Sequence, residues 1–527
     1  MLNSRIPAMR NQAWIGLFLF GLAMWLAWDI GGKIAANDVR TLVFWTLGLA
    51  SGGVAIMILR NWRRGFFFFL LWLLFEDLAR KYLGNGMALF FGKDVLALLV
   101  YISLFVAIRE KKEKTFRPPF LVFFALFFWL GVAQVFNMNS PSILYGLLGV
   151  KLYFYYVPLM FAGYALIRND GDLRRLLAFN AGLAIVIAGL GITQALLGHS
   201  FLNPTVLAPE LRDLGELDRV TPLSGQVLSL PTAVFVSSGR FALFLVLVFI
   251  LIIGAAGYLL LHTSKHRVLV FSAVGVVGGA ALFSGSRTAV VYCAASALVL
   301  AVGMLWGAPW RRRQAHRMVK AIRRSAIVGG LGLTALLLLF PTEAGSRIAF
   351  YTETLSPHSS AYEISGRAWD YPMANLVGVF SNPNWVLGNG TGTASLGVQY
   401  VSKLLGQRPP DFWAEEGYGQ LILEMGIVAP FMWLLWTGAL LYYQWRILLQ
   451  LRQTRVFPIA LAIFWFSFLL LYPFTYGGLA PYHNYVNNAY FWLLVGIMFR
   501  LPEIAATSSM PVAAAPGRTG TRGGFQF

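Results

Sequence analysis

Residues 241–262 read FALFLVLVFILIIGAAGYLLLH, a run of 22 residues without a charged side chain. A helix that crosses a lipid bilayer needs about 20 mainly apolar residues, so this run has the length and composition of a membrane span. The whole chain has the same character, because 58% of its 527 residues are hydrophobic and only 12% are charged. Soluble proteins carry about 25% charged residues. The sequence therefore predicts an all-α polytopic membrane protein.

Similar apolar runs recur along the chain and predict about 12–14 transmembrane helices. Several runs are short, which leaves the number open within that range. The predicted spans lie near residues 13–28, 41–59, 65–76, 93–108, 119–136, 143–167, 175–196, 241–262, 267–284, 288–307, 325–340, 417–443, 456–474 and 486–500.

This layout predicts three parts. An N-terminal transmembrane bundle covers residues 1–267, and a core of further spans covers residues 268–500. The core includes residues 341–416, a stretch between spans that is long enough to form a small subdomain with helices of its own. The tail, residues 501–527, is rich in Ala, Gly, Ser and Thr, which is typical of disorder.

The basic residues predict the orientation. The chain has 42 Lys+Arg against 22 Asp+Glu, a formal charge of +20. These cations cluster in short loops between apolar runs, which argues against the continuous basic surface of a nucleic-acid-binding protein. Alternate loops and both termini hold most of them, and the positive-inside rule places that set in the cytoplasm. Residues 341–416 are then expected on the extracytoplasmic side.

Cys293 is the only cysteine, so no intrachain disulfide is expected. The histidines and cysteine show no ligand spacing typical of zinc, and we expect no metal and no cofactor. The first apolar run lacks a small-residue cleavage site and is interpreted as a signal anchor.

The segment Ser284–Ala289 reads SGSRTA and connects two predicted spans on the outer side. Gly and Ser permit a tight turn, while the guanidinium of Arg287 offers a planar fork suited to phosphate. A hairpin turn with a snorkelling arginine is an equally good interpretation.

Two further motifs lie in the long outer segment. Residues 365–369 read SGRAW, in which Arg367 is an outward cation and Trp369 could stack on a sugar or anchor at the membrane interface. Residues 387–392 read LGNGTG, in which Gly388 and Gly390 allow the backbone to approach a ligand closely and its N–H groups to form an anion nest. A flexible connector is the plainer interpretation of these glycines.

Glu415, Glu416 and Tyr418 precede the predicted span 417–443. A carboxylate at a partly buried rim can serve as general base for a sugar hydroxyl. Alternatively, the acidic pair caps a helix N-terminus, where negative charge is stabilised. Glu424, further into the span, is expected to form an ion pair with Lys151 or an outer arginine.

Charged residues also flank the third and fourth predicted spans, where Glu76-Asp77 is followed by Arg80-Lys81 and Lys93-Asp94. Glu76 and Arg80 are four residues apart and can pair on one helix face. A structural ion pair is the favoured interpretation, although a basic rim could also bind a lipid phosphate.

This arrangement of motifs resembles the bacterial O-antigen ligase and polymerase superfamily, polytopic GT-C-like proteins that act on undecaprenyl-pyrophosphate glycans. The resemblance is carried by SGSRTA around Arg287, by GRAW around Arg367, by LGNGTG, and by EEGYGQLILEMG from Glu415 to Gly426. Its strong part covers residues 280–440. The first half of the chain matches in hydrophobic layout and in residues 75–94.

The resemblance implies a mechanism without metal or nucleotide. Arg287 and Arg367, with Arg240 as a third contact, would hold the pyrophosphate of the lipid-linked donor. Glu415, at the position of the ligases' histidine, and Glu416 would be the catalytic pair that activates the acceptor hydroxyl. Trp369, Gly388, Gly390 and Tyr418 would belong to the substrate loop.

The Glu–Glu pair departs from the His–Asn typical of ligases that attach O-antigen to the lipid A core. We therefore expect a polymerase of O-antigen, capsule or exopolysaccharide repeat units, in the bacterial inner membrane with an extracytoplasmic active site. The expected partners are the undecaprenyl-pyrophosphate-linked glycan, a glycan acceptor, the lipid bilayer and a possible chain-length regulator. Two alternatives stay open: a ligase that transfers finished glycan to another acceptor, and a polysaccharide flippase or transporter.

Overall fold

The structure is a computed structural model, and most of the chain is described in it. It describes residues 39–84, 87–204, 217–261, 267–309, 338–362, 366–472 and 478–509, together with residues 24, 28, 29, 32, 323, 327, 334, 335 and 364. The predicted span 13–28, most of the predicted span 325–340 and most of the tail lie outside these residues.

The described part of the chain is 74% helical and has almost no sheet, as predicted. The helices before the hairpin are α2 (Val39–Arg60), α3 (Trp62–Leu83), α4 (Met87–Arg109), α5 (Leu121–Ala133), η1 (Gln134–Phe136), α6 (Ile143–Phe154), α7 (Leu159–Leu166) and α8 (Asp170–Leu197). Strands β1 (Asp218–Val220) and β2 (Val227–Ser229) pair antiparallel, with Asp218 opposite Ser229.

The second half of the chain continues with α10 (Ser238–Leu261), α11 (Arg267–Phe283), α12 (Arg287–Gly307) and α14 (Pro341–Leu355). The segment expected to form a subdomain contains α14, the π-helical turn η2 (Gly366–Asp370), α15 (Tyr371–Val379) and α16 (Val398–Leu405). The last helices are α17 (Gly417–Met425), α18 (Val428–Gln450), α19 (Phe457–Leu471), α20 (Ala480–His483) and α21 (Tyr485–Ser509).

Among the described residues, six helical segments are long and apolar enough to cross a membrane: Leu89–Arg109, Ile143–Leu166, Asp170–Leu197, Ser238–Leu261, Arg287–Gly307 and Tyr485–Ala506. Shorter apolar helices accompany them at Ala50–Arg60, Leu121–Phe136, Arg267–Phe283 and Phe457–Leu471. The chain therefore has the helices of a membrane protein. The number of 12–14 spans and the orientation stay predictions.

Two predicted boundaries were wrong, and one predicted span contains a break, each for a local reason. Residues 417–443 do not form one helix, because the chain breaks at Gly426 with φ +83°, where a Cβ atom would stand 2.3 Å from the carbonyl oxygen of Val386. Residues 143–167 are split into α6 and α7, with Pro158 at the start of α7. The last helix continues past residue 500 to Ser509, so the first part of the expected tail is helical.

The chain forms two compact units. The first comprises residues 1–69 and 94–106, where the Ser103 hydroxyl donates to the carbonyl oxygen of Ile58 at 3.0 Å. The second comprises residues 70–93 and 107–527. The expected boundary at 267/268 falls inside this second unit, where α10 packs against α11.

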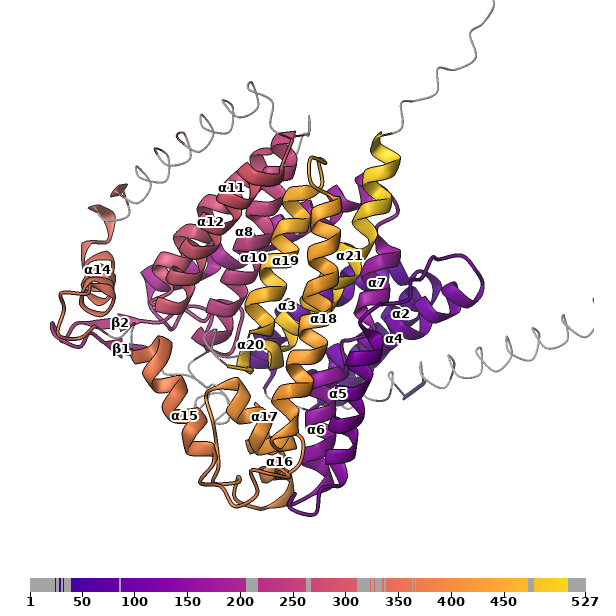
Figure 1. The fold of residues 1–527 in the computed structure, drawn as a ribbon, viewed down its shortest axis with the longest axis horizontal. Helices are drawn as coiled ribbons and strands as arrows, with labels where there is room; N and C mark the ends of the chain where they lie inside the picture. Colours follow the sequence, from indigo (N-terminus) through magenta and orange to yellow (C-terminus); the bar gives the residue numbers. More distant parts are fainter. Residues whose placement is uncertain are drawn as a thin grey trace, which may run out of the picture. The chain divides into compact units, whose positions relative to one another are not determined.

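The core of the second unit is built around α10, the helix formed by the run 241–262. It packs against α8, α11, α12 and α19, and these helices lie side by side in Figure 1. Its candidate span is the most buried of the six. A helix that is apolar all round belongs inside a bundle, which explains why this run lacks a polar face.

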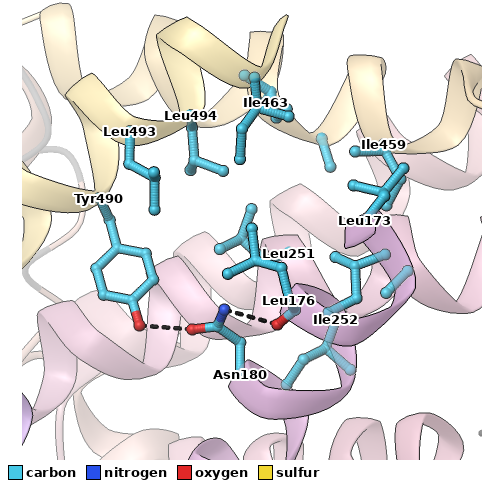
Figure 2. Close-up of a pocket in the computed structure, with 14 residues that line it drawn as sticks. Leu173, Leu176, Asn180, Leu251, Ile252, Ile459, Ile463, Tyr490, Leu493 and Leu494 are labelled. Atoms are coloured by element: carbon cyan, nitrogen blue, oxygen red, sulfur yellow. Dashed lines mark hydrogen bonds between the residues drawn. The ribbon is translucent and has the colours of Figure 1, made fainter. Parts of the chain in front are cut away.

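A cavity of about 30 Å³ lies between α8, α10, α19 and α21 (Figure 2). Its walls are aliphatic apart from Asn180 and Tyr490. The Tyr490 hydroxyl donates to Asn180 Oδ1 at 2.5 Å, and Asn180 Nδ2 donates to the Leu176 carbonyl oxygen at 2.9 Å. Because these polar groups satisfy each other, the cavity is a packing void rather than a substrate site.

Candidate functional site

A second, much larger cavity of about 990 Å³ also lies within the second unit. Its walls come from α4, α6, α10, α16 and α20 and from the starts of α12 and α21, and they are mostly apolar. Among the described residues that line it, Lys93, Lys151, Arg240 and Lys403 are basic, and none is acidic. The cavity thus combines a volume suited to a large ligand with apolar walls and several basic side chains.

Apart from the four-residue helix α20, six of the described helices begin at the wall of this cavity. Each contributes a residue of its first turn or its N-cap: Phe90 (α4), Leu144 (α6), Gly239 (α10), Thr288 (α12), Gly397 (α16) and Tyr485 (α21). The N-terminal end of a helix carries a partial positive charge. The helix ends therefore add to the field of the four basic side chains, and the combined field favours an anion.

Three of the cations make cation–π contacts with two aromatic rings that they share. Lys93 Nζ lies 4.1 Å from the centroid of Phe90, and Lys151 Nζ lies 4.7 Å from the same centroid. Lys93 Nζ also lies 4.7 Å from the centroid of Tyr485, whose ring is 5.2 Å from Arg240 Cζ. We call Lys151, Lys93 and Arg240, with the rings of Phe90 and Tyr485 between them, the cation row.

Two members of the cation row form ion pairs with carboxylates of α3. Lys93 Nζ is 3.0 Å from Glu76 Oε2, and Arg240 Nη1 is 2.8 Å from Asp77 Oδ2. Asp77 also accepts a bond from Arg80 at 3.0 Å, and the predicted pair of Glu76 and Arg80 is present with an N–O distance of 3.8 Å. Both carboxylates are fully buried.

Lys81 completes this network through two neutral oxygen acceptors and the nearby charge of Asp77. Its ammonium donates to Thr232 Oγ1 at 2.8 Å and to the carbonyl oxygen of Ala233 at 2.9 Å. Among the described residues, this network therefore brings the basic side chains of Arg80, Lys81, Lys93 and Arg240 together with the carboxylates of Glu76 and Asp77.

The predicted phosphate-binding arginines are distributed over three places. Arg240 lines the cavity. Ser286 and Thr288 line it too, while Arg287 between them is half-buried, with Cζ 5.5 Å from the ring of Phe350. Arg367 lies on η2, with its side chain 59% exposed, and is not among the described residues that line the cavity.

The predicted catalytic pair has two different environments. Glu415 is 41% exposed, and its Oε2 lies 3.9 Å from Arg367 Nη1. Glu416 is buried and caps α17, accepting the N–H of Tyr418 at 2.6 Å and that of Gly419. Burial raises the pKa of Glu416 to about 7. For Glu416, the geometry supplies the capping role that the sequence had left open.

The start of α17 adjoins the segment that leads to the cavity wall. A Cβ atom on Gly478 would stand 2.1 Å from the carbonyl oxygen of Glu415, so the two backbones are in contact. Residues 480, 481 and 483–485, which follow directly, line the cavity. The backbone of Glu415 thus contacts the segment that leads directly into α20, and residues of α20 line the cavity. Tyr418, the second residue of α17, is half-buried.

The backbone of the glycine motif LGNGTG forms hydrogen bonds to another part of the protein, the helix α17. Asn389 N donates to the Leu423 carbonyl oxygen at 2.8 Å, and Gly390 N donates to that of Glu424 at 2.9 Å. Gly388 has φ +78°, and a Cβ there would stand 2.6 Å from Gly426 N. These N–H groups dock the loop on α17 and are not presented to an anion. Trp369 on η2 is 63% exposed.

The expected ion pair of Glu424 is absent among the described residues. Its buried carboxylate accepts from the hydroxyls of Tyr153 at 3.0 Å and Ser395 at 2.6 Å, and from Ala394 N at 3.2 Å. These neutral donors satisfy the carboxylate without a cation. Lys151 lies instead in the cavity wall.

Sequence reasoning named Lys93 as part of a basic rim that could bind a lipid phosphate, but it did not place Lys151 or His483 at this site. The signal for Lys151 was its charge inside an apolar run. His483 is buried in the cavity wall, with Nδ1 3.5 Å from Gln420 Nε2, and burial lowers its pKa to about 3. The ring is therefore neutral at physiological pH. No local pattern indicates that these side chains meet.

Among the described residues, no group of three His, Cys, Asp or Glu side chains could hold a metal ion. No family model, no curated protein and no solved structure matches the chain.

Proposed function

We propose that this chain is a membrane glycosyltransferase that polymerises undecaprenyl-pyrophosphate-linked oligosaccharide repeat units on the extracytoplasmic side of a bacterial inner membrane. The large cavity carries this proposal, because its apolar walls suit an isoprenoid chain and its four basic side chains suit a phosphorylated headgroup. The motifs shared with the ligase and polymerase superfamily supply the reaction class.

The proposed reaction needs alignment and charge neutralisation. The acceptor hydroxyl oxygen attacks the anomeric carbon of the donor sugar, whose bond to the pyrophosphate oxygen breaks. The carrier pyrophosphate leaves with the electron pair of that bond, and nearby cations stabilise the negative charge that develops. The hydroxyl proton passes to a base, for which Glu415 is the candidate.

The test is a polymerisation assay with purified protein and undecaprenyl-pyrophosphate repeat unit from the native strain. A ladder of longer lipid-linked glycans, strongly reduced in Arg240→Ala, is the expected result. Transfer that occurs only after lipid A core is added would replace the polymerase with a ligase. Movement of labelled lipid-linked glycan across liposome membranes without either product would replace both with a transporter.

A further inference from the structure

The cation row draws its members from three helices that are distant in sequence. Lys93 belongs to α4, Lys151 to α6 and Arg240 to α10, and all three line the same cavity. Lys93 and Lys151 share the ring of Phe90, so their ammonium groups cannot be further apart than the sum of their distances to it, 4.1 and 4.7 Å. The row therefore places neighbouring positive groups at the wall of one cavity.

The row is oriented before any ligand binds. The carboxylate of Glu76 holds Lys93, whose side chain is only 1% exposed, and that of Asp77 holds Arg240 with contacts of 2.8 and 3.1 Å. Lys151 lies 4.5 Å from the ring of Phe91 as well as beside Phe90. Little side-chain freedom is then lost when an anion binds.

The number and spacing of these cations suit an anion with more than one phosphate. A diphosphate carries charge at both ends, so each phosphate can meet a cation of its own. The leucine-rich wall formed by Leu144, Leu147 and Leu148 continues the cavity beside the cation row. An apolar chain attached to the diphosphate would bury its surface against these side chains.

From these contacts we infer that Lys93, Lys151 and Arg240 together bind the diphosphate of a polyisoprenyl diphosphate. This assignment rests on the proposed function for the identity of the lipid. It adds two lysines, from α4 and α6, to the phosphate site. Glu76 and Asp77 act as positioning residues that fix the row without contacting the ligand.

The test measures binding without any glycan, so that it does not depend on transfer. The full chain is placed in phosphatidylcholine nanodiscs, and native mass spectrometry records binding of undecaprenyl diphosphate, undecaprenyl phosphate, undecaprenol and inorganic pyrophosphate. We expect undecaprenyl diphosphate to bind most tightly. Inorganic pyrophosphate should bind more weakly, because it lacks the apolar chain.

Lys151→Gln should weaken undecaprenyl diphosphate binding about 10-fold or more, because a charge-assisted contact to phosphate is lost. It should weaken undecaprenol binding little. Lys151→Arg keeps the charge and should retain most of the affinity. Lys112→Gln, whose side chain is 70% exposed near the start of the α4–α5 connection, is the matched control and should bind as wild type.

Lys93 requires a paired substitution, because removing it alone would leave the Glu76 carboxylate buried without its ion pair. The double variant Glu76→Gln with Lys93→Gln removes both charges at nearly constant volume. Its thermal unfolding confirms that it folds. We expect it to lose diphosphate binding by about the same factor as Lys151→Gln.

Equal binding of the diphosphate and undecaprenol by wild type would overturn the inference. So would unchanged diphosphate binding in both lysine variants. If a glycan ladder forms while these variants bind normally, the glycosyltransferase stands and the cation row fails. If the diphosphate binds through the row but no ladder or ligase product forms, the row stands and the glycosyltransferase fails.

Discussion

Two arginine–carboxylate pairs of this chain differ in almost every physical respect. Arg240 and Asp77 lie 2.8 Å apart, with the carboxylate fully buried. Arg367 and Glu415 lie 3.9 Å apart, with both side chains largely exposed. The family resemblance implied one phosphate site for both arginines, yet only Arg240 is among the described residues that line the large cavity.

The difference shows what burial adds to an ion pair. Water screens the charges of an exposed pair, so the contact contributes little to stability. A buried pair loses its hydration, and each member then depends on its partner. The cavity pair is consequently rigid and sensitive to substitution, whereas the outer pair can open and close at little cost.

The largest expected effect is on stability at Asp77. Asp77→Ala removes the carboxylate shared by Arg240 and Arg80, and we expect a loss of about 3–5 kcal/mol because Arg80, which is buried, and Arg240, which is 27% exposed, both lose this charge-paired contact. Thermal unfolding in detergent measures it. Glu415→Ala is the matched variant of the exposed pair and should change stability by less than about 1 kcal/mol. Equal losses would remove the distinction between the two pairs.

The second prediction compares the arginines in catalysis. Arg240→Ala should slow glycan polymerisation about 100-fold, the scale of one lost contact to developing negative charge. Arg367→Ala should slow it by a smaller factor, since Arg367 does not line the cavity. The rate of ladder formation is the measurement, with unfolding temperature as a check on folding. A greater loss in Arg367→Ala would place the donor phosphates at the outer loop.

The third prediction concerns the cap of α17. The pKa of Glu416, raised from 4.5 to about 7 by burial, means that the folded chain binds this proton more tightly than the unfolded chain. Its contribution to stability is present below pH 4.5 and is lost as pH rises through 7. The loss is at most about 1.4 kcal/mol per pH unit. Unfolding temperatures from pH 4.5 to 8 should show this decline.

Glu416→Gln is the control for that decline, because it removes the titrating group and retains an oxygen that can accept from the helix N–H groups. Its unfolding temperature should depend less on pH than that of wild type over the same range. The same slope in both proteins would mean that another group causes the pH dependence.

The smallest expected effect is the coupling within the outer pair. A double-mutant cycle of Arg367→Ala and Glu415→Ala should give a coupling energy below about 1 kcal/mol, which falls further as salt is added. Unfolding measurements at low and high ionic strength would determine it. A larger, salt-independent coupling would show that the pair is shielded from water.

Much of the helical framework could be predicted from the sequence. The predicted spans 41–59, 241–262 and 267–284 agree closely with α2, α10 and α11, because continuous apolar runs bounded by polar residues define a helix locally. The break at Gly426 could not be predicted in this way. It depends on the carbonyl oxygen of Val386, which is 40 residues away in the chain.

The candidate site was less accessible to sequence reasoning. Arg240 could be identified as a cation at the end of an apolar run. Lys93 and Lys151 are equally visible as charges, but their meeting at Phe90 depends on how α4 and α6 pack. The sequence left two interpretations of Glu416 open, a general base and a helix cap. Its buried position at the N-cap of α17 became visible only in the structure. Which of these side chains meet is decided by packing between segments that are distant in sequence, and local patterns do not contain that information.

The most direct test of the central claim is a cryo-electron microscopy structure of the wild-type protein with bound undecaprenyl diphosphate. The account predicts density for the two phosphates beside Lys93, Lys151 and Arg240, with the isoprenoid chain along the apolar wall of the large cavity. Phosphate density beside Arg367 and Glu415, with the large cavity empty of lipid, would contradict it.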